Sequence, residues 1–246
     1  MLPEPPPRGL QDAESVALTM PDGTRLAGWF IPPFPRPSPP FPALLWFYGN
    51  GETIAAIWPV LRDFRPPRTA LLVVDYPGYG ASEGRATEPA FYIAADLAYA
   101  ALAARPGVDP ARVRVYGRSL GSAAATYVAA NHPVAGLILE SPFTNAREMS
   151  RRHYAPFPRF LIRLRLDNLD MITRVRCPVL ILHGTEDRLV PLEMGRRVAA
   201  AVPGPVELVV IDGAGHNDTY DMGGVAYRNK LWEFLDNPKA RSNLPG

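Results

Sequence analysis

The chain has 246 residues, a length that fits one large α/β domain, and no segment repeats at a fixed period. Hydrophobic residues make up 47% and charged residues 20% of it, which excludes a chain that is disordered throughout. The net charge of +2 gives no argument for nucleic-acid binding, and one cysteine with four scattered histidines gives no metal framework.

Both ends of the chain predict tails outside the fold, at residues 1–14 and 238–246. The N-terminal sequence MLPEPPPRGL has neither the apolar run nor the cleavage site of a secretory signal. No stretch reaches the roughly 20 apolar residues of a membrane span, so we expect a cytoplasmic protein. The proline-rich stretch at 32–42 is expected to be an extended loop between two strands, not a ligand for a proline-binding module.

Short apolar runs typical of strands alternate with longer helical patterns along most of the chain. VALTM and RLAGWFI, with PDGT between them, predict an antiparallel hairpin at the sheet edge. Six more runs predict buried strands, at 44–48, 71–75, 113–117, 137–140, 179–184 and 207–212. Helices are predicted between them, at about 52–64, 88–105, 119–131, 191–202 and 221–236. Since parallel strands need long crossovers, this order predicts an α/β fold with a mostly parallel, eight-stranded sheet and helices on both faces.

The spacing G-x-S-x-G occurs twice, around Ser82 in GASEG and around Ser119 in GRSLG. Ligands of such sheets bind beyond the carboxyl ends of the strands. Ser119 directly follows the strand run VRVYG and precedes an Ala-rich helical pattern, which is the context of a nucleophile elbow. Ser82 lies in a Gly/Pro-rich loop well after its strand, so we interpret GASEG as a loop. Ser119 is the candidate nucleophile; the alternative is a strand-to-helix turn that happens to contain serine.

A serine nucleophile needs a histidine base, and in this type of fold the chain order is nucleophile, acid, base. His216 lies between the last strand run and the C-terminal helical pattern, so it is the predicted base. The other three histidines fit less well. His132 ends a helix, His153 lies in an irregular arginine-rich segment, and His183 precedes any plausible acid loop.

The acid should follow a strand that lies between the nucleophile and the base in the chain. Asp187, in HGTEDRLVP, directly follows the run VLILHG and is the predicted acid. Its expected task is to fix the tautomer of His216 and to stabilise the imidazolium. Two alternatives are the adjacent Glu186, which should point away, and Glu140, which follows an earlier strand.

Two backbone N–H groups are predicted to form an oxyanion hole. The first belongs to Leu120, which follows the nucleophile at a helix N-terminus. The second should come from the loop YGNGE after the strand at 44–48, where glycines let the backbone approach closely. The N–H of Asn50 is the predicted donor and that of Gly51 the alternative. The other interpretation of this loop is a Gly-rich turn without a ligand.

Seven motifs together resemble the serine hydrolases of the α/β-hydrolase superfamily, and within it the relatives of the α/β-hydrolase-domain protein depalmitoylases. The motifs are DGTRLAGWFIPP, FYGNGE, VVDYPGYGASEG, VYGRSLGSAAA, ESPFTNAREM, CPVLILHGTEDRLVP and GAGHND. The resemblance covers nearly everything from about Ser15 to Leu235. It implies a triad of Ser119, Asp187 and His216 and an oxyanion loop at Asn50.

Tyr48 departs from the pattern of these relatives, which usually carry His at this position. That histidine shapes the loop and is not the base. The resemblance also implies that Asp75 and Tyr79, in DYPGYG, buttress the site without taking part in chemistry. The elbow carries neither the Asp expected of haloalkane dehalogenases nor the Cys expected of dienelactone hydrolases.

An insertion after the strand at 137–140 usually sets specificity in this superfamily. Here residues 142–173 leave room only for a small cap between the core segments 15–141 and 174–237, which implies an open site. The cap combines basic and apolar residues, namely Arg147, Arg151, Arg152, Arg159, Arg163 and Arg165 with Tyr154, Phe157, Phe160, Leu161 and Ile162. We favour a solvated arginine face over a buried apolar one; the alternative is a surface that attracts anionic acyl substrates or weakly contacts a phospholipid membrane.

The sequence therefore predicts a serine hydrolase that cleaves carboxylic esters or thioesters, including lipid-like acyl esters, through an acyl-enzyme. No cofactor and no metal are expected, and the expected partner is a small acyl ester or thioester. The alternatives are a peptidase or amidase with the same triad, and a catalytically silent scaffold that binds a ligand or partner. The sequence leaves the oligomeric state open.

Overall fold

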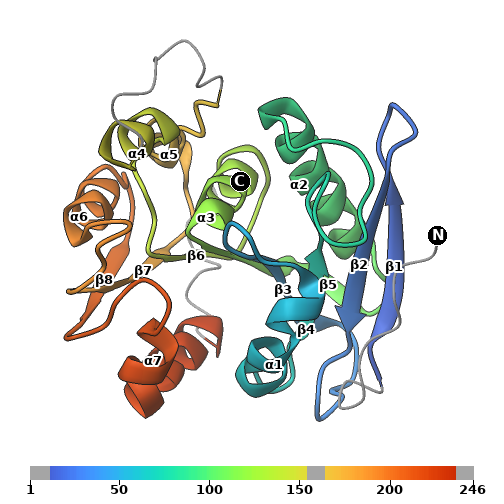
Figure 1. Ribbon diagram of the computed structural model, residues 1–246. Helices are drawn as coiled ribbons and strands as arrows, with labels where there is room; N and C mark the ends of the chain where they lie inside the picture. The colour runs from blue at the N-terminus through green and yellow to red at the C-terminus, as the bar shows by residue number, and fades with distance from the viewer. Residues whose placement is uncertain (1–11, 154–163, 237–246) are drawn as a thin grey trace.

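The computed structural model describes residues 12–153 and 164–236, so the predicted tails lie almost entirely outside the described residues. The predicted cap residues 154–163 lie outside them as well. Eight strands form one sheet in the order β1-β2-β4-β3-β5-β6-β7-β8 (Figure 1). The strands are β1 (Glu14–Thr19), β2 (Arg25–Ile31), β3 (Phe41–Phe47), β4 (Ala70–Val74), β5 (Val108–Arg118), β6 (Gly136–Glu140), β7 (Val179–Gly184) and β8 (Val206–Ile211).

Helices cover both faces of this sheet. They are α1 (Ile54–Phe64), α2 (Glu88–Ala103), α3 (Leu120–Asn131), α4 (Ala146–His153), α5 (Asn168–Met171), the 3₁₀ turn η2 (Ile172–Arg174), α6 (Leu192–Ala200) and α7 (Thr219–Asp236). In the view of Figure 1, α1 and α7 lie below the sheet, whereas α2, α3 and α6 lie above it. None of the helices within the described ranges is long and apolar enough to cross a bilayer.

The pairing of the strands confirms the predicted fold class. β1 and β2 form the antiparallel hairpin, β2 pairs antiparallel with β4, and all other neighbours run parallel. β3, β4, β6 and β7 are buried at every residue, which is expected of parallel strands with helices on both faces. The proline-rich stretch does connect two strands, because β2 ends at Ile31 and β3 begins at Phe41.

The cap differs from its sequence interpretation at one point. The arginine-rich segment that was expected to be irregular forms α4, which ends at His153. Most residues of this helix are polar, and Met149 is its one large apolar residue, so apolar periodicity gives little signal for it. Its first turn is held instead by Asn145, whose side chain accepts the N–H of Glu148 at 2.9 Å, and by an ion pair of 2.7 Å between Glu148 and Arg197 of α6.

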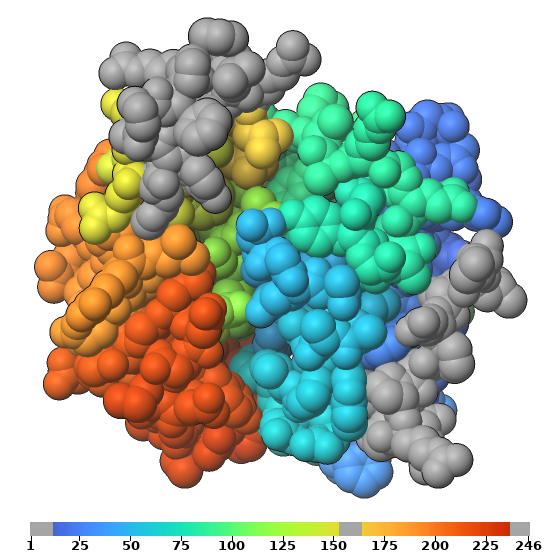
Figure 2. Space-filling model, in the orientation of Figure 1, coloured from blue at the N-terminus to red at the C-terminus, as the bar shows by residue number. Residues whose placement is uncertain are grey.

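The carboxyl ends of the parallel strands meet at one edge of the sheet, where the loops after β3, β5, β7 and β8 come together. Figure 2 shows green atoms from the middle of the chain between the light-blue residues that follow β3 and the orange residues of the C-terminal part. Residues far apart in the sequence thus share one face of the molecule, and the candidate site residues lie on these loops.

Candidate active site

Ser119 occupies a sharp turn between β5 and α3. Its backbone has a φ of +49°, a conformation that is strained for a residue with a side chain. The turn also needs its two glycines. A Cβ on Gly117 would lie 2.3 Å from the carbonyl oxygen of Gly121, and a Cβ on Gly121 would lie 2.3 Å from that of Phe47. The sequence G-x-S-x-G is therefore a steric requirement of this strand–turn–helix.

The structure brings the three predicted triad residues together in one hydrogen-bonded chain. His216 Nε2 lies 2.9 Å from Ser119 Oγ, and His216 Nδ1 lies 2.8 Å from Asp187 Oδ2. All three side chains come from loops that follow different strands, β5, β7 and β8. This is the geometry in which an imidazole can take a proton from a hydroxyl while a carboxylate fixes its tautomer.

Asp187 is held in place by the backbone around it. Its Oδ1 accepts the N–H groups of Leu189 at 3.1 Å and Val190 at 2.7 Å, which leaves Oδ2 for the imidazole. Burial alone would raise the pKa of Asp187, but the hydrogen bonds from His216 and Val190 hold it below its ordinary value. The carboxylate therefore stays ionised beside His216.

The loop that carries His216 is fastened to the loop after β7. The N–H of Glu186 donates to the carbonyl of Ala214 at 2.9 Å, and the N–H of Gly213 donates to the Thr185 hydroxyl at 2.8 Å. Gly213 has a φ of +73°, the left-handed conformation that allows this tight turn. Backbone contacts as well as side chains therefore hold Asp187 and His216 next to each other.

Two of the other histidines, His132 and His183, have partners other than Ser119. His132 Nε2 lies 2.7 Å from Asp96 Oδ1, and its ring stacks on Tyr99 at the C-terminal end of α3. His183 is fully buried in β7, with Nε2 at 2.8 Å from the carbonyl of Val190, and burial lowers its pKa. Neither ring makes the hydrogen bond to Ser119 Oγ that His216 makes.

The competing serine and acids are occupied or turned away. Ser82 donates to the carbonyl of Asp75 at 2.7 Å and accepts the N–H of Ala27 at 2.9 Å, so its hydroxyl holds the loop together. Glu186 is exposed, as expected of a side chain that points away. Glu140 is buried and accepts the hydroxyls of the three residues Tyr116, Thr219 and Tyr227, the last at 2.6 Å.

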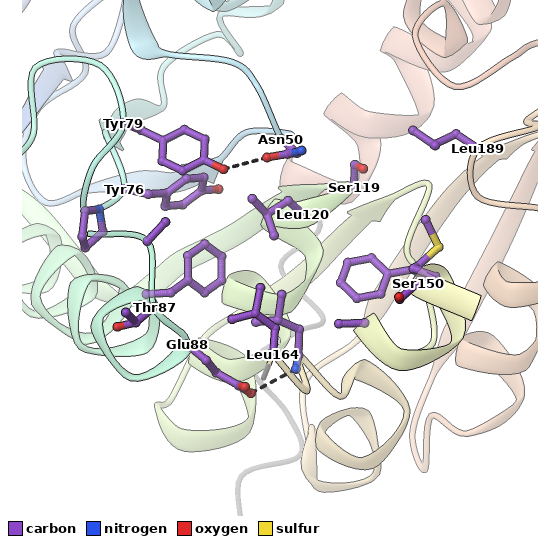
Figure 3. Close-up of a pocket in the computed structure, with 17 residues that line it drawn as sticks. Asn50, Tyr76, Tyr79, Thr87, Glu88, Ser119, Leu120, Ser150, Leu164 and Leu189 are labelled. Carbon is purple, nitrogen blue, oxygen red and sulfur yellow. Dashed lines mark hydrogen bonds between the residues drawn. The ribbon is translucent and has the colours of Figure 1, made fainter. Parts of the chain in front are cut away.

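Leu120 and Asn50 line the same cavity as Ser119 (Figure 3). Leu120 is the first residue of α3, where backbone N–H groups lack partners within the helix. In the loop after β3, the N–H of Gly49 is taken by Glu52 at 2.6 Å, and Gly51 has a φ of +75°. For the N–H groups of Asn50 and Leu120, no acceptor is found among the described residues.

Tyr48 replaces the usual histidine and supports the same loop. Its hydroxyl donates to Asp75 Oδ1 at 2.8 Å and accepts the N–H of Tyr76 at 3.1 Å. The same Asp75 oxygen accepts the N–H of Ile54 at the start of α1. Burial outweighs these hydrogen bonds and raises the pKa of Asp75. Tyr79 holds the loop from the other side, since its hydroxyl donates to Asn50 Oδ1 at 2.6 Å.

A cavity of about 870 Å³ opens beside Ser119 and runs between α2 and the cap. Most of the side chains around it are apolar, among them Phe91, Leu120, Phe143, Met149, Leu164, Leu166 and Leu189. Glu88 forms part of its polar wall (Figure 3). The described cap arginines Arg147, Arg151, Arg152 and Arg165 are exposed. This shape suits an apolar group attached to a carbonyl at Ser119.

Sequence reasoning missed Arg118, which lies within the motif itself. Its guanidinium bonds the carbonyl of His216 at 2.9 Å and the side chain of Glu52 at 2.7 Å. A charged residue between an apolar strand and the nucleophile is the signal that could have drawn attention to it. Over the described ranges, no group of three or more His, Cys, Asp or Glu side chains is arranged so that it could hold a metal ion.

Comparisons with known proteins agree with this architecture. The model of a family described as "alpha/beta hydrolase fold" matches residues 42–161, and that of a "TAP-like protein" family matches 166–243. An uncharacterized protein of Mycobacterium tuberculosis is 34% identical over 229 residues, which cover 92% of this chain and 80% of that protein. The human alpha/beta hydrolase domain-containing protein 17B is 36% identical over 167 residues, 65% of this chain and 54% of that protein.

Solved structures show the same fold at low sequence identity. The Pyrococcus furiosus esterase Pf2001 superposes with a TM-score of 0.75 at 21% identity, and the match covers 96% of both chains. At this identity the likeness concerns the arrangement of the sheet and helices and not the substrate.

Proposed function

The alpha/beta hydrolase domain-containing protein WAV2 of Arabidopsis thaliana is 31% identical over 244 residues, 91% of this chain and 78% of that protein, so the chain belongs to the α/β-hydrolase superfamily. We propose that it is a serine hydrolase that cleaves carboxylic esters or thioesters through an acyl-enzyme. The observation that carries this proposal is the continuous chain of hydrogen bonds from Ser119 to His216 and from His216 to Asp187, at 2.9 and 2.8 Å. A binding scaffold has no need for such a chain at the end of a strained elbow.

Acylation begins when Ser119 Oγ attacks the carbonyl carbon of the substrate. His216 Nε2 takes the hydroxyl proton as the bond forms, and Asp187 stabilises the resulting imidazolium. The imidazolium then gives this proton to the leaving alcohol or thiol, and the carbon–oxygen or carbon–sulfur bond breaks. The products of this half-reaction are the free alcohol or thiol and an acyl group on Ser119.

Hydrolysis of the acyl-enzyme uses the same groups in reverse. His216 removes a proton from water, the hydroxide attacks the acyl carbonyl, and the proton returns to Ser119 Oγ as the acid leaves. In both halves the N–H groups of Asn50 and Leu120 hold the negative oxygen of the tetrahedral intermediate. One such donor is typically worth about 100- to 1000-fold in turnover.

The cavity beside Ser119 supports an acyl group with a substantial apolar part. Its volume of about 870 Å³ and its wall of leucine, phenylalanine and methionine side chains favour burial of hydrocarbon. A peptidase or amidase with the same three residues remains the second candidate, because the triad chemistry does not depend on the leaving atom. We favour esters and thioesters because the wall near Ser119 offers few polar groups for a peptide backbone.

Labelling with a fluorophosphonate probe tests the proposal. The wild-type protein should be modified at Ser119, and Ser119→Ala should abolish labelling and ester hydrolysis. Ser82→Ala is the matched control, because it removes the other serine in a G-x-S-x-G spacing and should keep the labelling. An unreactive, folded wild-type protein would favour the silent scaffold, and labelling that persists in Ser119→Ala would mean that the nucleophile is another residue.

A panel of p-nitrophenyl esters, acyl thioesters and peptide amides then separates the candidate reactions. We expect turnover of esters and thioesters and faster reaction with butyrate or longer acyl chains than with acetate. Turnover confined to peptide amides would instead support the peptidase.

A further inference from the structure

We propose that Arg118 is a positioning residue that fixes the base and the oxyanion donor relative to the nucleophile, an inference that rests on the function proposed above. Two segments are concerned. The base loop, residues 212–218, carries His216, and the oxyanion loop, residues 48–53, carries Asn50. Arg118 immediately precedes Ser119, so its backbone belongs to the elbow while its side chain contacts both loops.

The first contact holds the base loop. Arg118 Nη2 donates to the carbonyl oxygen of His216 at 2.9 Å and to Oδ1 of Asn217 at 2.6 Å. The first of these bonds reaches the backbone of the base itself. It therefore fixes the position from which the imidazole projects toward Ser119, over a sequence separation of 98 residues.

The second contact holds the oxyanion loop through a shared carboxylate. Arg118 Nη1 donates to Oε1 of Glu52 at 2.7 Å, while Oε2 of Glu52 accepts the N–H of Gly49 at 2.6 Å. A Cβ on Gly49 would lie 3.2 Å from Arg118 Nη1, so the turn packs directly against the guanidinium. Asn50, the predicted donor, is the next residue in this turn.

A third contact links Arg118, through Glu140, to Thr219, which directly follows the base loop. Arg118 Nε lies 3.4 Å from Oε1 of Glu140, which faces it across the paired ends of β5 and β6. The same oxygen of Glu140 accepts the hydroxyl of Thr219, the first residue of α7. The base loop is thus held by Arg118 at His216 and by the Arg118–Glu140 pair just beyond its end.

The chemistry of arginine suits this task. Burial alone would lower the pKa of Arg118, but the carboxylates of Glu140 and Glu52 raise it above its ordinary value, so the cation is maintained. A planar guanidinium presents donors in three directions at once, whereas a lysine ammonium is a compact charge at the end of a flexible stem. Lysine at this position could satisfy one of the two loops but not both.

The Arg118 side chain lies outside the cavity beside Ser119, so it contacts the catalytic loops and not the substrate. It borders a second cavity of about 320 Å³ on the far side of Asn50, together with Glu52, Glu140 and Asn217, and it is absent from the wall of the larger cavity. Its loss should therefore misplace the base and the oxyanion donor while the acyl pocket keeps its shape.

Steady-state kinetics on Arg118→Lys and Arg118→Ala test this role. We expect kcat to fall about 100-fold, the size of effect known for a misplacement of about 1 Å, while KM for the same ester changes little. Guanidinium ions at non-denaturing concentration should partly restore kcat to Arg118→Ala, because the variant leaves room beside the second cavity, whereas methylammonium should not. Arg112→Lys, earlier in the same strand β5, is the control and should behave like the wild type.

Hydrogen–deuterium exchange provides a readout that does not depend on turnover. In Arg118→Ala the backbone of residues 48–53 and of residues 212–218 should exchange faster than in the wild type, and in Arg118→Lys at least one of these two loops should do so. Exchange in β3 and β7 should stay the same in both variants. Variants with kcat within about threefold of the wild type and unchanged exchange in both loops would overturn the proposal. A wild-type protein that fails to react with the fluorophosphonate would instead overturn the proposed function, and the exchange measurement would still decide whether Arg118 fixes the loops.

Discussion

Asp187 lies between two histidines, and the two contacts are not equivalent. Its Oδ2 is 2.8 Å from His216 Nδ1 but 3.5 Å from His183 Nε2, which lies closer to the carbonyl of Val190. Because burial lowers the pKa of His183, that ring stays neutral and adds no competing cation. The negative charge of Asp187 is therefore directed at His216.

Asp187→Asn should leave the backbone contacts of Oδ1 in place but remove the charge that orients His216. We expect kcat to fall on the order of 10⁴-fold, since an amide favours the wrong imidazole tautomer. Glu186→Gln is the matched control, because that carboxylate is adjacent in the sequence and exposed. Comparable losses in the two variants would remove Asp187 from the role of acid.

At the scale of elements, the first turn of α2 holds the return of the cap to the core. Glu88 accepts the N–H of Arg165 at 2.7 Å and the N–H of Leu166 at 3.0 Å, one on each carboxylate oxygen (Figure 3 draws the second). Leu164 and Leu166 form part of the cavity wall, and Leu166 has a φ of +40°. One carboxylate thus positions two leucine side chains over the pocket.

Glu88→Gln removes the negative charge and one of the two acceptors, so this part of the wall should loosen. We expect KM for a long-chain ester to rise several-fold, because a hydrogen bond to a charged group contributes about 1.5–3 kcal/mol and Glu88→Gln loses only part of that contribution. The kcat/KM for an acetyl ester should stay within about twofold. Kinetics with esters of increasing chain length measure this effect. The exposed Glu193 of α6 serves as a control through Glu193→Gln, and equal losses for short and long chains in Glu88→Gln would contradict a role in the pocket wall.

The order of the elements could be predicted from the sequence because each parallel strand is an unbroken apolar run with a helix after it. VLILHG matches β7 at both ends, and the other predicted runs lie within a few residues of their strands. Ser119, Asp187 and His216 could be singled out for the same reason, since the ends of parallel strands meet at one edge. The helix α4 could not be predicted, because most of its residues are polar and its start depends on Asn145 and Arg197.

Arg118 escaped prediction for a different physical reason. Two of its partners are far from Arg118 in the chain: Glu52 lies 66 residues before it, and His216 lies 98 residues after it. The charge next to the nucleophile is visible in the sequence, but no local pattern records which distant residues it contacts. A partly buried arginine and a surface arginine look alike in a sequence, and only the packing of the loops around the side chain distinguishes them.

At the scale of the whole molecule, the depressed pKa of Asp187 links stability to pH. The folded state binds the Asp187 proton more weakly than the unfolded chain, whose carboxyl has a pKa of about 3.9. The resulting stabilisation is present above that value and is lost as the pH falls through the lower pKa of the folded state. Thermal unfolding of the wild type and of Asp187→Asn from pH 6 to pH 3 should show the difference in Tm shrinking as the pH falls. A difference that stays constant would mean that this carboxylate does not titrate differently in the two states.

The cap enters the fold between β6 and the 3₁₀ turn before β7, and its described return segment is attached to the core through few polar anchors. Asn168 donates to the hydroxyl of Ser122 and to the carbonyl of Phe143, both at 2.9 Å, and Glu88 holds the neighbouring backbone. None of these anchors belongs to the triad or to the loops that Arg118 fixes. We therefore expect the cap to behave as a separable module: a segment of another length, grafted between Ser141 and Asp167, should exchange one acyl selectivity for another while the reaction centre is inherited unchanged.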